Sequence, residues 1–458
     1  MKKIATILAM AVVFCLTNSN TTLARAAEDD TSTFVPHGTF SGYAFGDYYY
    51  KNNSDSLGRG AGNVQYRGLA PSSTNGANPN GPQTNAFQIR RAYFNYDYDF
   101  ARNLSAHATL ADEAGPNISG LPGTNLDAGG SNTVYVKYFN VKWENIFKGS
   151  NLIIGQQVTP SFASTPYGTE PLWGYRSIER TIMDLHNIDA SSDMGIALQG
   201  NLWKQAVDET PSTIGYFLQV GNGNSAKPES DRYKKYRVNL FANFLQQQLT
   251  IGVYADANGI MNSSTMNTTT MKGYIHFKMD WFRIGAEFFQ QTNRNGDIYA
   301  TSFAKGATVD TSNGVQSGFS VFASSRIIKG KLNIFARYDM YNPDSKFSSS
   351  NEYKATATGS ISSTTTASTA SVLYTQTFIT AGLDWTPNST RFHIMPNIWY
   401  NQYQTMSGLT DYSTISSTAT SGNTYSGVRA NAKDMVYRVT FYFVFNASKK
   451  INNNGMDN

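Results

Sequence analysis

The chain has 458 residues, of which 13% are aromatic and only 15% are charged, and its formal net charge is +5. Such a low and nearly balanced charge argues against a protein that binds nucleic acid or another polyanion. A single cysteine, Cys15, excludes a disulfide framework and a cysteine-ligated zinc site.

The first residues have the pattern of a secretory signal peptide. Lys2 and Lys3 precede an apolar run over residues 4–16, and the small-residue site "ARA" follows at residues 24–26. This pattern is typical of a segment that is cleaved, here after residue 26 or 27, and not of a membrane anchor. Cys15 lies inside it, so the mature chain contains no thiol. We expect residues 1–26 to be a signal peptide and the protein to be exported.

The mature chain is built of stretches in which polar and apolar residues alternate. In "DMVYRVTFYFVFN" (434–446), every second residue from Met435 to Phe445 is apolar, and the opposite face contains Arg438 and Thr440. The same period of two recurs at 237–245, 271–280, 282–290 and 331–339. Strands of about ten residues with this alternation are typical of outer-membrane barrels. No mature segment has the ~18 uninterrupted apolar residues of a transmembrane helix.

Long and short connections alternate between the predicted strands. From the first strand (39–50) through 87–98, 104–111, 134–143 and 152–159 to the last, the pattern gives eight long and seven short connections, and therefore sixteen strands. The long connections are Lys51–Thr84, Asp112–Ser131, Pro160–Ser192, Gly221–Lys235, Asn258–Thr270, Thr292–Gly314, Asn342–Ser371 and Gln404–Arg429. The predicted fold is all-β, a transmembrane antiparallel β-barrel of about 16 strands over residues 27–446, followed by a polar tail at 447–458.

Membrane physics assigns the two faces of each strand. The sheet must close, because an open edge would leave unpaired backbone groups in hydrocarbon. A Lys or Arg facing lipid at mid-depth costs roughly 2–4 kcal/mol, so the alternating charges must face the interior. A barrel of about sixteen strands is wide enough for an aqueous channel. The residues predicted to line this pore are Arg237, Lys278, Arg283, Glu287, Arg337, Asp339 and Arg438.

A secreted β-sandwich would also alternate, but its strands usually span five or six residues. One predicted strand fits the barrel poorly, because in "FQIRRAYFNY" Phe87 and Ile89 share the phase of Arg91, whereas the apolar phase later passes to Ala92. Two explanations remain open, a β-bulge at Arg90–Arg91 or a membrane span that begins after Arg91.

The third long connection contains "YRSIERTIMDLHNI" (175–188), which has a different period. Ile178, Ile182 and Leu185 are spaced i, i+4, i+7, which predicts a short amphipathic helix. Its apolar stripe needs a wall to cover it and its charges need water, and a barrel interior supplies both. We therefore expect this loop to fold inward. The residues predicted at the pore constriction are Arg176, Glu179, Arg180 and Asp184.

Several stretches resemble the phosphate-selective porin-like family of bacterial outer-membrane channels. They are "FQIRRAYFNY" (87–96), "IIGQQVTPSF" (153–162), "VGNGN" (220–224), "ARYDMYNPD" (336–344) and the terminal "VYRVTFYFVF". The resemblance implies a sixteen-stranded trimeric porin whose third long loop folds inward. Selective members cluster arginines and lysines at the constriction. Here the inserted loop is mixed in charge, and the acids Asp256, Glu287 and Asp339 also lie on lumen phases.

No catalytic or cofactor motif stands out. The five histidines are spread along the chain without a serine partner, and we expect no enzyme activity, metal or cofactor. Three functions compete. The first is a diffusion channel for small hydrophilic solutes and inorganic anions with mild anion preference. The second is a channel specific for phosphate or an oligosaccharide, and the third is a barrel adhesin or barrel enzyme. We favour the first, as a homotrimer in the lipid of a Gram-negative-type outer membrane.

Overall fold

A computed structural model describes thirteen segments of the chain: residues 34–53, 84–113, 134–162, 172–205, 212–229, 232–259, 267–300, 309–345, 353–355, 370–371, 374–387, 391–405 and 431–446. The predicted signal peptide and the predicted C-terminal tail lie outside these segments. Within them, no helix has both the length and the apolar character needed to cross a membrane.

Antiparallel strands make up almost all of the described structure. They are β1 (His37–Asn53), β2 (Thr84–Ala101), β3 (Leu104–Glu113), β4 (Tyr135–Phe147), β5 (Ser150–Val158), β6 (Ser192–Lys204), β7 (Thr213–Gly221), β8 (Lys235–Phe244), β9 (Leu249–Gly259), β10 (Asn267–Lys278), β11 (Phe282–Ala300), β12 (Val309–Ile328), β13 (Leu332–Asn342), β14 (Tyr353–Ala355), β15 (Ala370–Ser371), β16 (Tyr374–Trp385), β17 (Phe392–Thr405) and β18 (Asn431–Asn446). One helix, α2 (Ile182–Leu185), is described.

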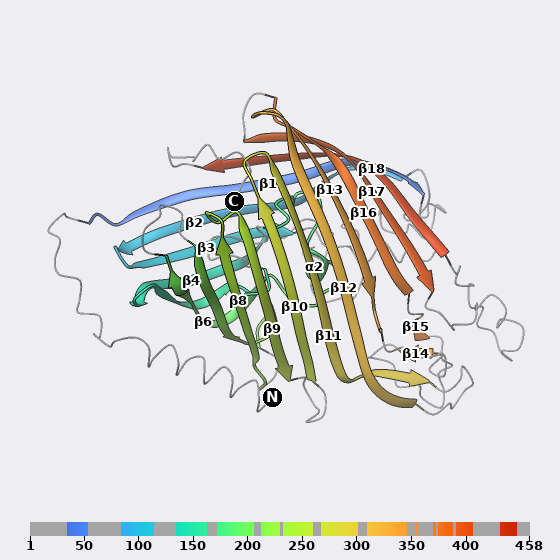
Figure 1. Cartoon of the computed structure of the whole chain (residues 1–458), viewed down its shortest axis with the longest axis horizontal. Coiled ribbons are helices and arrows are strands. Elements are labelled where there is room, and N and C mark those ends of the chain that lie inside the picture. Colours follow the sequence, from blue (N-terminus) through green and yellow to red (C-terminus); the bar gives the residue numbers. More distant parts are fainter. Residues whose placement is uncertain are drawn as a thin grey trace, which may run out of the picture.

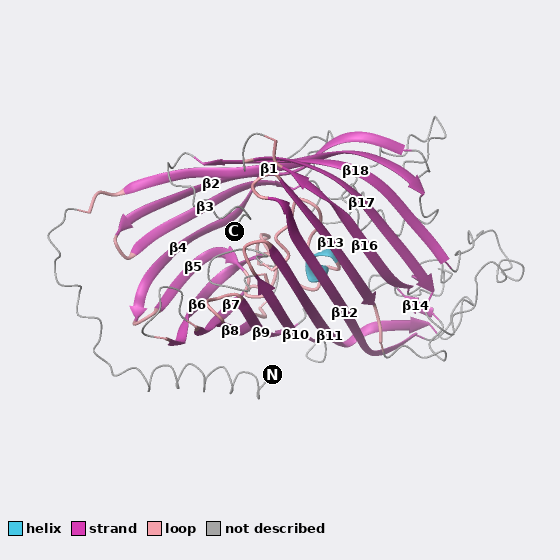
Figure 2. Ribbon diagram, turned by 45° about the horizontal axis from the view of Figure 1, so that its top comes forward, coloured by secondary structure: helices cyan, strands magenta, loops and turns pink. Residues whose placement is uncertain are grey.

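Sixteen of these strands form a closed barrel (Figures 1 and 2). Each pairs antiparallel with its neighbours along the chain, and β1 pairs with both β2 and β18, which closes the ring. The other two strands, β14 and β15, are short and lie beside the far end of β11, outside the ring. The predicted barrel and its alternation of long and short connections are therefore confirmed.

The strand ends differ most from prediction at one long connection. β11 continues to Ala300 and β12 begins at Val309, so most of the connection predicted at Thr292–Gly314 is strand. The backbone ladder between them runs past the point where the apolar alternation stops. Backbone pairing needs no apolar side chains, so the side-chain pattern marks the edge of the apolar band and not the end of the strand.

The side chains alternate between the two faces as predicted. In β13, Ile334 and Met340 are about half exposed on the outer face, whereas Arg337 and Asp339 are buried on the inner face. β18 repeats the pattern, with Tyr437 outside and Arg438 inside. An apolar outer face and a charged inner face are the arrangement that a lipid environment requires.

Two of the β-bulges each add a basic side chain to the inner face. Phe45 pairs with Arg91 and Gly46 pairs with Ile89, so Arg90 is an extra residue in β2. Arg90 and Arg91 are both buried inside, which confirms the first of the two explanations for the irregular strand. In β4, Lys137 is the extra residue, because Tyr138 pairs with Thr109 and Val136 pairs with Leu110. Lys137 is also buried.

Candidate functional site: the inserted loop and the lumen wall

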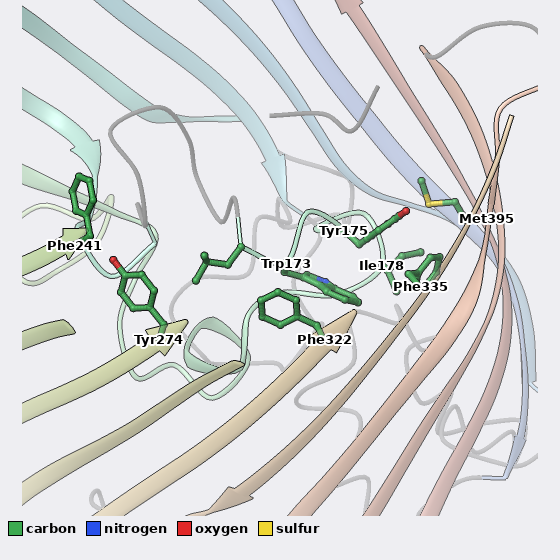
Figure 3. Packing of buried hydrophobic residues seen from close by; sticks show 9 residues of the cluster. Trp173, Tyr175, Ile178, Phe241, Tyr274, Phe322, Phe335 and Met395 are labelled. Atoms are coloured by element: carbon green, nitrogen blue, oxygen red, sulfur yellow. The ribbon is translucent and has the colours of Figure 1, made fainter. Parts of the chain in front are cut away.

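In the connection between β5 and β6, residues 159–191, the described residues pack against the inner face of the barrel wall. We call this connection the inserted loop, and the structure describes its residues 159–162 and 172–191. Figure 3 shows Trp173, Tyr175 and Ile178 of the loop beside Phe322 and Phe335 of the wall. The cluster takes members from the inner faces of five strands, and its wall residues are Phe241 of β8, Tyr274 of β10, Phe322 of β12, Phe335 of β13 and Met395 of β17. The described residues of the loop therefore pack on side chains of the inner wall.

The apolar stripe that suggested this placement is covered completely. Ile178, Ile182 and Leu185 are each at most 1% exposed. Ile182 packs with Tyr254 of β9 and Phe289 of β11, two aromatic residues whose phase faces the lumen. Full burial of an aliphatic side chain contributes about 1.5–3 kcal/mol, so the stripe alone gives the loop several kcal/mol of attachment.

The helix is shorter than predicted. The pattern indicated a helix over much of 175–188, whereas α2 spans one turn, Ile182–Leu185. A first turn forms, in which the Ile178 amide donates to the Tyr175 carbonyl at 2.8 Å, but Thr181 is extended (φ −61°, ψ 158°). Arginines of the wall bind the carbonyl oxygens that a continuous helix would use.

Three wall arginines make these contacts. Nη1 of Arg90 and Nη2 of Arg438 both donate to the Ile178 carbonyl at 3.1 Å. Nη1 of Arg337 donates to the carbonyl of Arg180 at 2.5 Å. In a continuous helix, these two carbonyls would accept the amides of residues 182 and 184. Charged donors on the barrel wall therefore end the helix early. The sequence pattern of the segment itself does not contain them.

Asp189 attaches the end of the inserted loop to β8 and β9. Its carboxylate accepts Nζ of Lys235 at 2.7 Å, Nη2 of Arg237 at 2.9 Å and the Tyr254 hydroxyl at 3.0 Å. Arg237 also donates to Asp193 at 2.7 Å. Burial by itself would raise the pKa of Asp189, but Arg237 and Lys235 hold that pKa well below its ordinary value. The carboxylate is therefore ionised and firmly held.

Six of the seven residues predicted to line the pore lie on the inner face but beneath the inserted loop. Arg237, Arg283, Glu287, Arg337, Asp339 and Arg438 are each at most 5% exposed. Their partners lie in the loop, among the six residues themselves or at other positions of the inner wall. Nζ of Lys272, for example, lies 2.5 Å from Glu287 and also donates to the carbonyl of Ser161 in the loop. Lys278, the seventh, is half-buried at the short-turn end of β10.

The position of Arg283 is one reason why residue 174 of the loop is glycine. Gly174 has a positive φ of 75°, which favours glycine. A Cβ atom at this position would lie 2.0 Å from Nη1 of Arg283, so a side chain here would displace the guanidinium group. The loop and the wall are therefore in close contact at this position.

Three of the four residues predicted at the constriction lie at the partly exposed edge of the loop. The side chains of Arg176, Arg180 and Asp184 are 13%, 14% and 15% exposed, and Arg180 lies 3.6 Å from Asp184. Glu179 differs from the prediction, because it is buried and its Oε1 accepts the Arg180 amide at 2.8 Å. Arg176 and Arg180 also do not belong to the helix, because α2 begins at Ile182.

Arg176 meets a group of side chains on β2, β3 and β4 that the sequence did not reveal. Here Glu113, the last residue of β3, accepts hydrogen bonds from Tyr93, Tyr135 and Lys137, and the guanidinium groups of Arg91 and Arg176 lie nearby. We call the five surrounding residues, Arg91, Tyr93, Tyr135, Lys137 and Arg176, the Glu113 cradle. Glu113 was assigned to a loop, because the alternation ends at Ala111.

The inner face of β3 and β4 is more open to water than the wall under the loop. His107, Tyr138 and Lys142 are partly exposed there, and His107 lies 2.6 Å from Asp97. Among the described residues, no group of three or more His, Cys, Asp or Glu side chains is placed to hold a metal ion.

No protein-family model and no curated protein matches this sequence. Among solved structures, the outer membrane channel DcaP of Acinetobacter baumannii is 10% identical over 90% of this chain and 97% of its own, with a TM-score of 0.50. The anion-selective porin from Comamonas acidovorans is 11% identical over 90% and 100%, with a TM-score of 0.47. OmpT of Vibrio cholerae is 10% identical over 90% and 99%, at 0.45. At these identities the likeness extends to architecture alone, and the chain has the sixteen-stranded barrel fold of bacterial outer-membrane porins.

Proposed function

We propose that this protein is an outer-membrane porin that forms a water-filled channel for passive diffusion of small hydrophilic solutes, with a mild preference for anions. The closed barrel, its apolar outer face and its charged inner face support a membrane channel. We further propose that three copies assemble, by analogy with the family that the sequence resembles. Export by the N-terminal segment would deliver the chain to the outer membrane.

The anion preference rests on one observation, the balance of charge where the inserted loop meets β2, β3 and β4. Among the described residues that form ion pairs there, four are cations and two are carboxylates, an excess of two positive charges. These groups are Arg91, Lys137, Arg176, Arg180, Glu113 and Asp184. Charges at a narrow, low-dielectric passage focus the field and outweigh the small net charge of the whole protein. The passing anion would meet Arg176 and Arg180 first, because they are partly exposed.

The same balance argues against strict selectivity for phosphate. Glu113 and Asp184 repel a multivalent anion at the point where a phosphate-selective channel would present cations alone. The buried acids Glu287 and Asp339 extend this mixture along the inner wall. We therefore propose general diffusion with weak anion preference as the function.

The test is the reversal potential of the purified protein in planar bilayers under a potassium chloride gradient. The wild-type channel should prefer chloride weakly, and Arg176→Ala/Arg180→Ala should remove the excess of two positive charges and shift the reversal potential toward the cation value. The matched control is Arg232→Ala/Lys234→Ala, which removes two cations from the connection between β7 and β8. An unchanged reversal potential in the first double variant would contradict this placement of the selectivity.

The channel itself and its assembly need separate measurements. Folded protein, judged by its heat-modifiable mobility in gels, should give stepwise conductance, and cross-linking in detergent should yield trimers. Silent bilayers with folded protein would refute the porin function. Monomers that conduct would refute only the proposed assembly.

A further inference from the structure

The short turn between β12 and β13 is basic. Residues 329–331 form this turn, and both Lys329 and Lys331 are exposed. Among the short turns that the structure describes in full, only this one contains two cations. Neither lysine forms an ion pair or a side-chain hydrogen bond with a described residue, whereas the buried Lys235 and Lys272 of the inner wall each lie against a carboxylate. The turn therefore presents two positive charges to its surroundings.

Large apolar side chains are exposed beside this turn. Ile327 is the extra residue of a bulge in β12, so two successive apolar side chains, Ile327 and Ile328, are 54% and 51% exposed. Trp281, in the turn between β10 and β11, is 56% exposed, and Trp385, at the end of β16, is 47% exposed. Tryptophan and lysine at the end of an apolar wall are typical of the boundary between lipid and water.

Hydrogen bonds to both neighbouring turns hold the backbone of this turn in place. The Arg326 amide, before the turn, donates to the Trp281 carbonyl at 2.7 Å. The Thr386 amide donates to the Lys331 carbonyl at 2.9 Å, and the Thr386 hydroxyl donates to the Gly330 carbonyl at 3.0 Å. A ligand bound here would need to order only side chains, which lowers the entropic cost of binding.

We propose that this turn binds an anionic phospholipid, with Lys329 and Lys331 on the headgroup phosphate and the isoleucines and tryptophans on the acyl chains. This inference rests on the proposed function only in that the barrel must lie in a membrane. The short turns of outer-membrane barrels face the periplasm, so the lipid belongs to the periplasmic leaflet. The neighbouring turn contains one exposed acid, Asp280, which weakens the attraction but does not cancel two lysines.

The test is the quenching of tryptophan fluorescence by lipids with brominated acyl chains. The folded protein is reconstituted in phosphatidylcholine that contains either brominated phosphatidylglycerol or brominated phosphatidylcholine. Subtracting the signal of Trp281→Phe/Trp385→Phe leaves the part that comes from the two tryptophans beside the turn. We expect brominated phosphatidylglycerol to quench this part at a mole fraction roughly fivefold lower than brominated phosphatidylcholine. Equal quenching by the two lipids would overturn the proposal.

Three double variants separate the turn from the general charge of this end of the barrel. Lys329→Ala/Lys331→Ala should abolish the preference for phosphatidylglycerol, and Lys329→Arg/Lys331→Arg should keep it, because arginine also pairs with phosphate. The matched control is Arg102→Ala/Lys148→Ala, which removes two cations from the turns between β2 and β3 and between β4 and β5. It should keep the preference near the two tryptophans. A control that loses the preference as completely as the first variant would refute the site.

Electrical recordings separate the lipid site from the channel function. An alternative role for the two lysines is attraction of ions to the mouth of the channel. A shifted reversal potential in Lys329→Ala/Lys331→Ala, without a lipid preference in the wild type, would assign them to ion passage and overturn the proposal. A preference for phosphatidylglycerol in a barrel that gives silent bilayers would support the lipid site and refute the porin. A conducting channel without the preference would refute the lipid site alone.

Discussion

The two sides of the barrel interior use the same residue types for different purposes. Under the inserted loop, the cations of β8, β10 and β13 each lie against a carboxylate and are sealed from water, as Arg337 is against Asp339 at 2.5 Å. Beside β2 to β4, three cations (Arg91, Lys137 and Arg176) lie around the carboxylate of Glu113, and the edge formed by Arg176 and Glu113 is partly exposed. We propose that the covered charges attach the loop, whereas the partly exposed charges act on passing ions. Position on a lumen-facing strand does not by itself make a residue part of the channel.

The largest effect on the difference between the two sides is expected when the inserted loop is removed. Replacing residues 175–188 with a short Gly/Ser linker should leave the barrel folded, because the backbone ladder closes without them. Conductance should rise and larger sugars should pass in liposome-swelling assays. The same replacement of residues 223–229, in the connection between β7 and β8, is the control. An unchanged size limit in the first variant would place the loop outside the passage.

Loosening the loop without deleting it should have the next largest effect. Asp189→Asn removes the ionised partner of Lys235 and Arg237, and breaking a buried ion pair costs about 3–5 kcal/mol. We expect noisy current and trypsin cleavage after Arg176 or Arg180 in the folded variant. Asn224→Asp, on the exposed connection, is a control for handling and charge. A protease-resistant loop in Asp189→Asn would show that the apolar contacts alone hold it.

A pair of single substitutions compares the two sides directly. Arg176→Ala should shift the reversal potential toward cations, because the guanidinium lies at the accessible edge. Arg337→Ala should change it less, because Asp339 and the covering loop already screen that charge. Arg337→Ala should instead increase current noise, since it loses a hydrogen bond to the loop. Equal shifts in the two variants would contradict the division between attachment and selectivity.

Acid should weaken the attachment of the loop to the wall through protonation of His186. This effect should be smaller than those of the variants above. Burial, and then the nearby Arg180 and Arg337, lower the pKa of His186 from 6.5 to about 3. The ring stacks on Tyr341, with centroids 3.5 Å apart, so the folded loop holds the neutral form. Its stabilising contribution is complete above pH 6.5 and is lost as the pH falls toward 3.

At pH 4.5 the loss should be roughly 1–3 kcal/mol. Trypsin does not work in acid, so the measurement is current noise at pH 7 and pH 4.5. His186→Phe keeps a ring on Tyr341 and removes the titration, and its noise should not rise in acid through this group. Wild type and His186→Phe with the same acid response would assign it to other residues.

The sequence predicted the barrel well because lipid imposes a strong rule on one face of each strand. It predicted the inward loop for a similar reason, since the stripe of Ile178, Ile182 and Leu185 had no other wall to cover it. It did not predict how far the helix extends, because Arg90, Arg337 and Arg438 lie far away in the chain. Glu113 was missed because it stands just past the last alternating residue, where membrane rules no longer apply.

The two bulges give the barrel a genetic route to new selectivity. Deleting the single codon for Arg90 would place Arg91 directly after Ile89, and the outward and inward alternation would run on unbroken into Ala92. Deleting Lys137 would likewise join Val136 to Tyr138 without a phase error. At a regularly paired position of these strands, losing one residue turns every following side chain to the wrong face. At these two points the gene can gain or lose one codon for a basic residue. The topology of the wall and the residues that face lipid then stay the same.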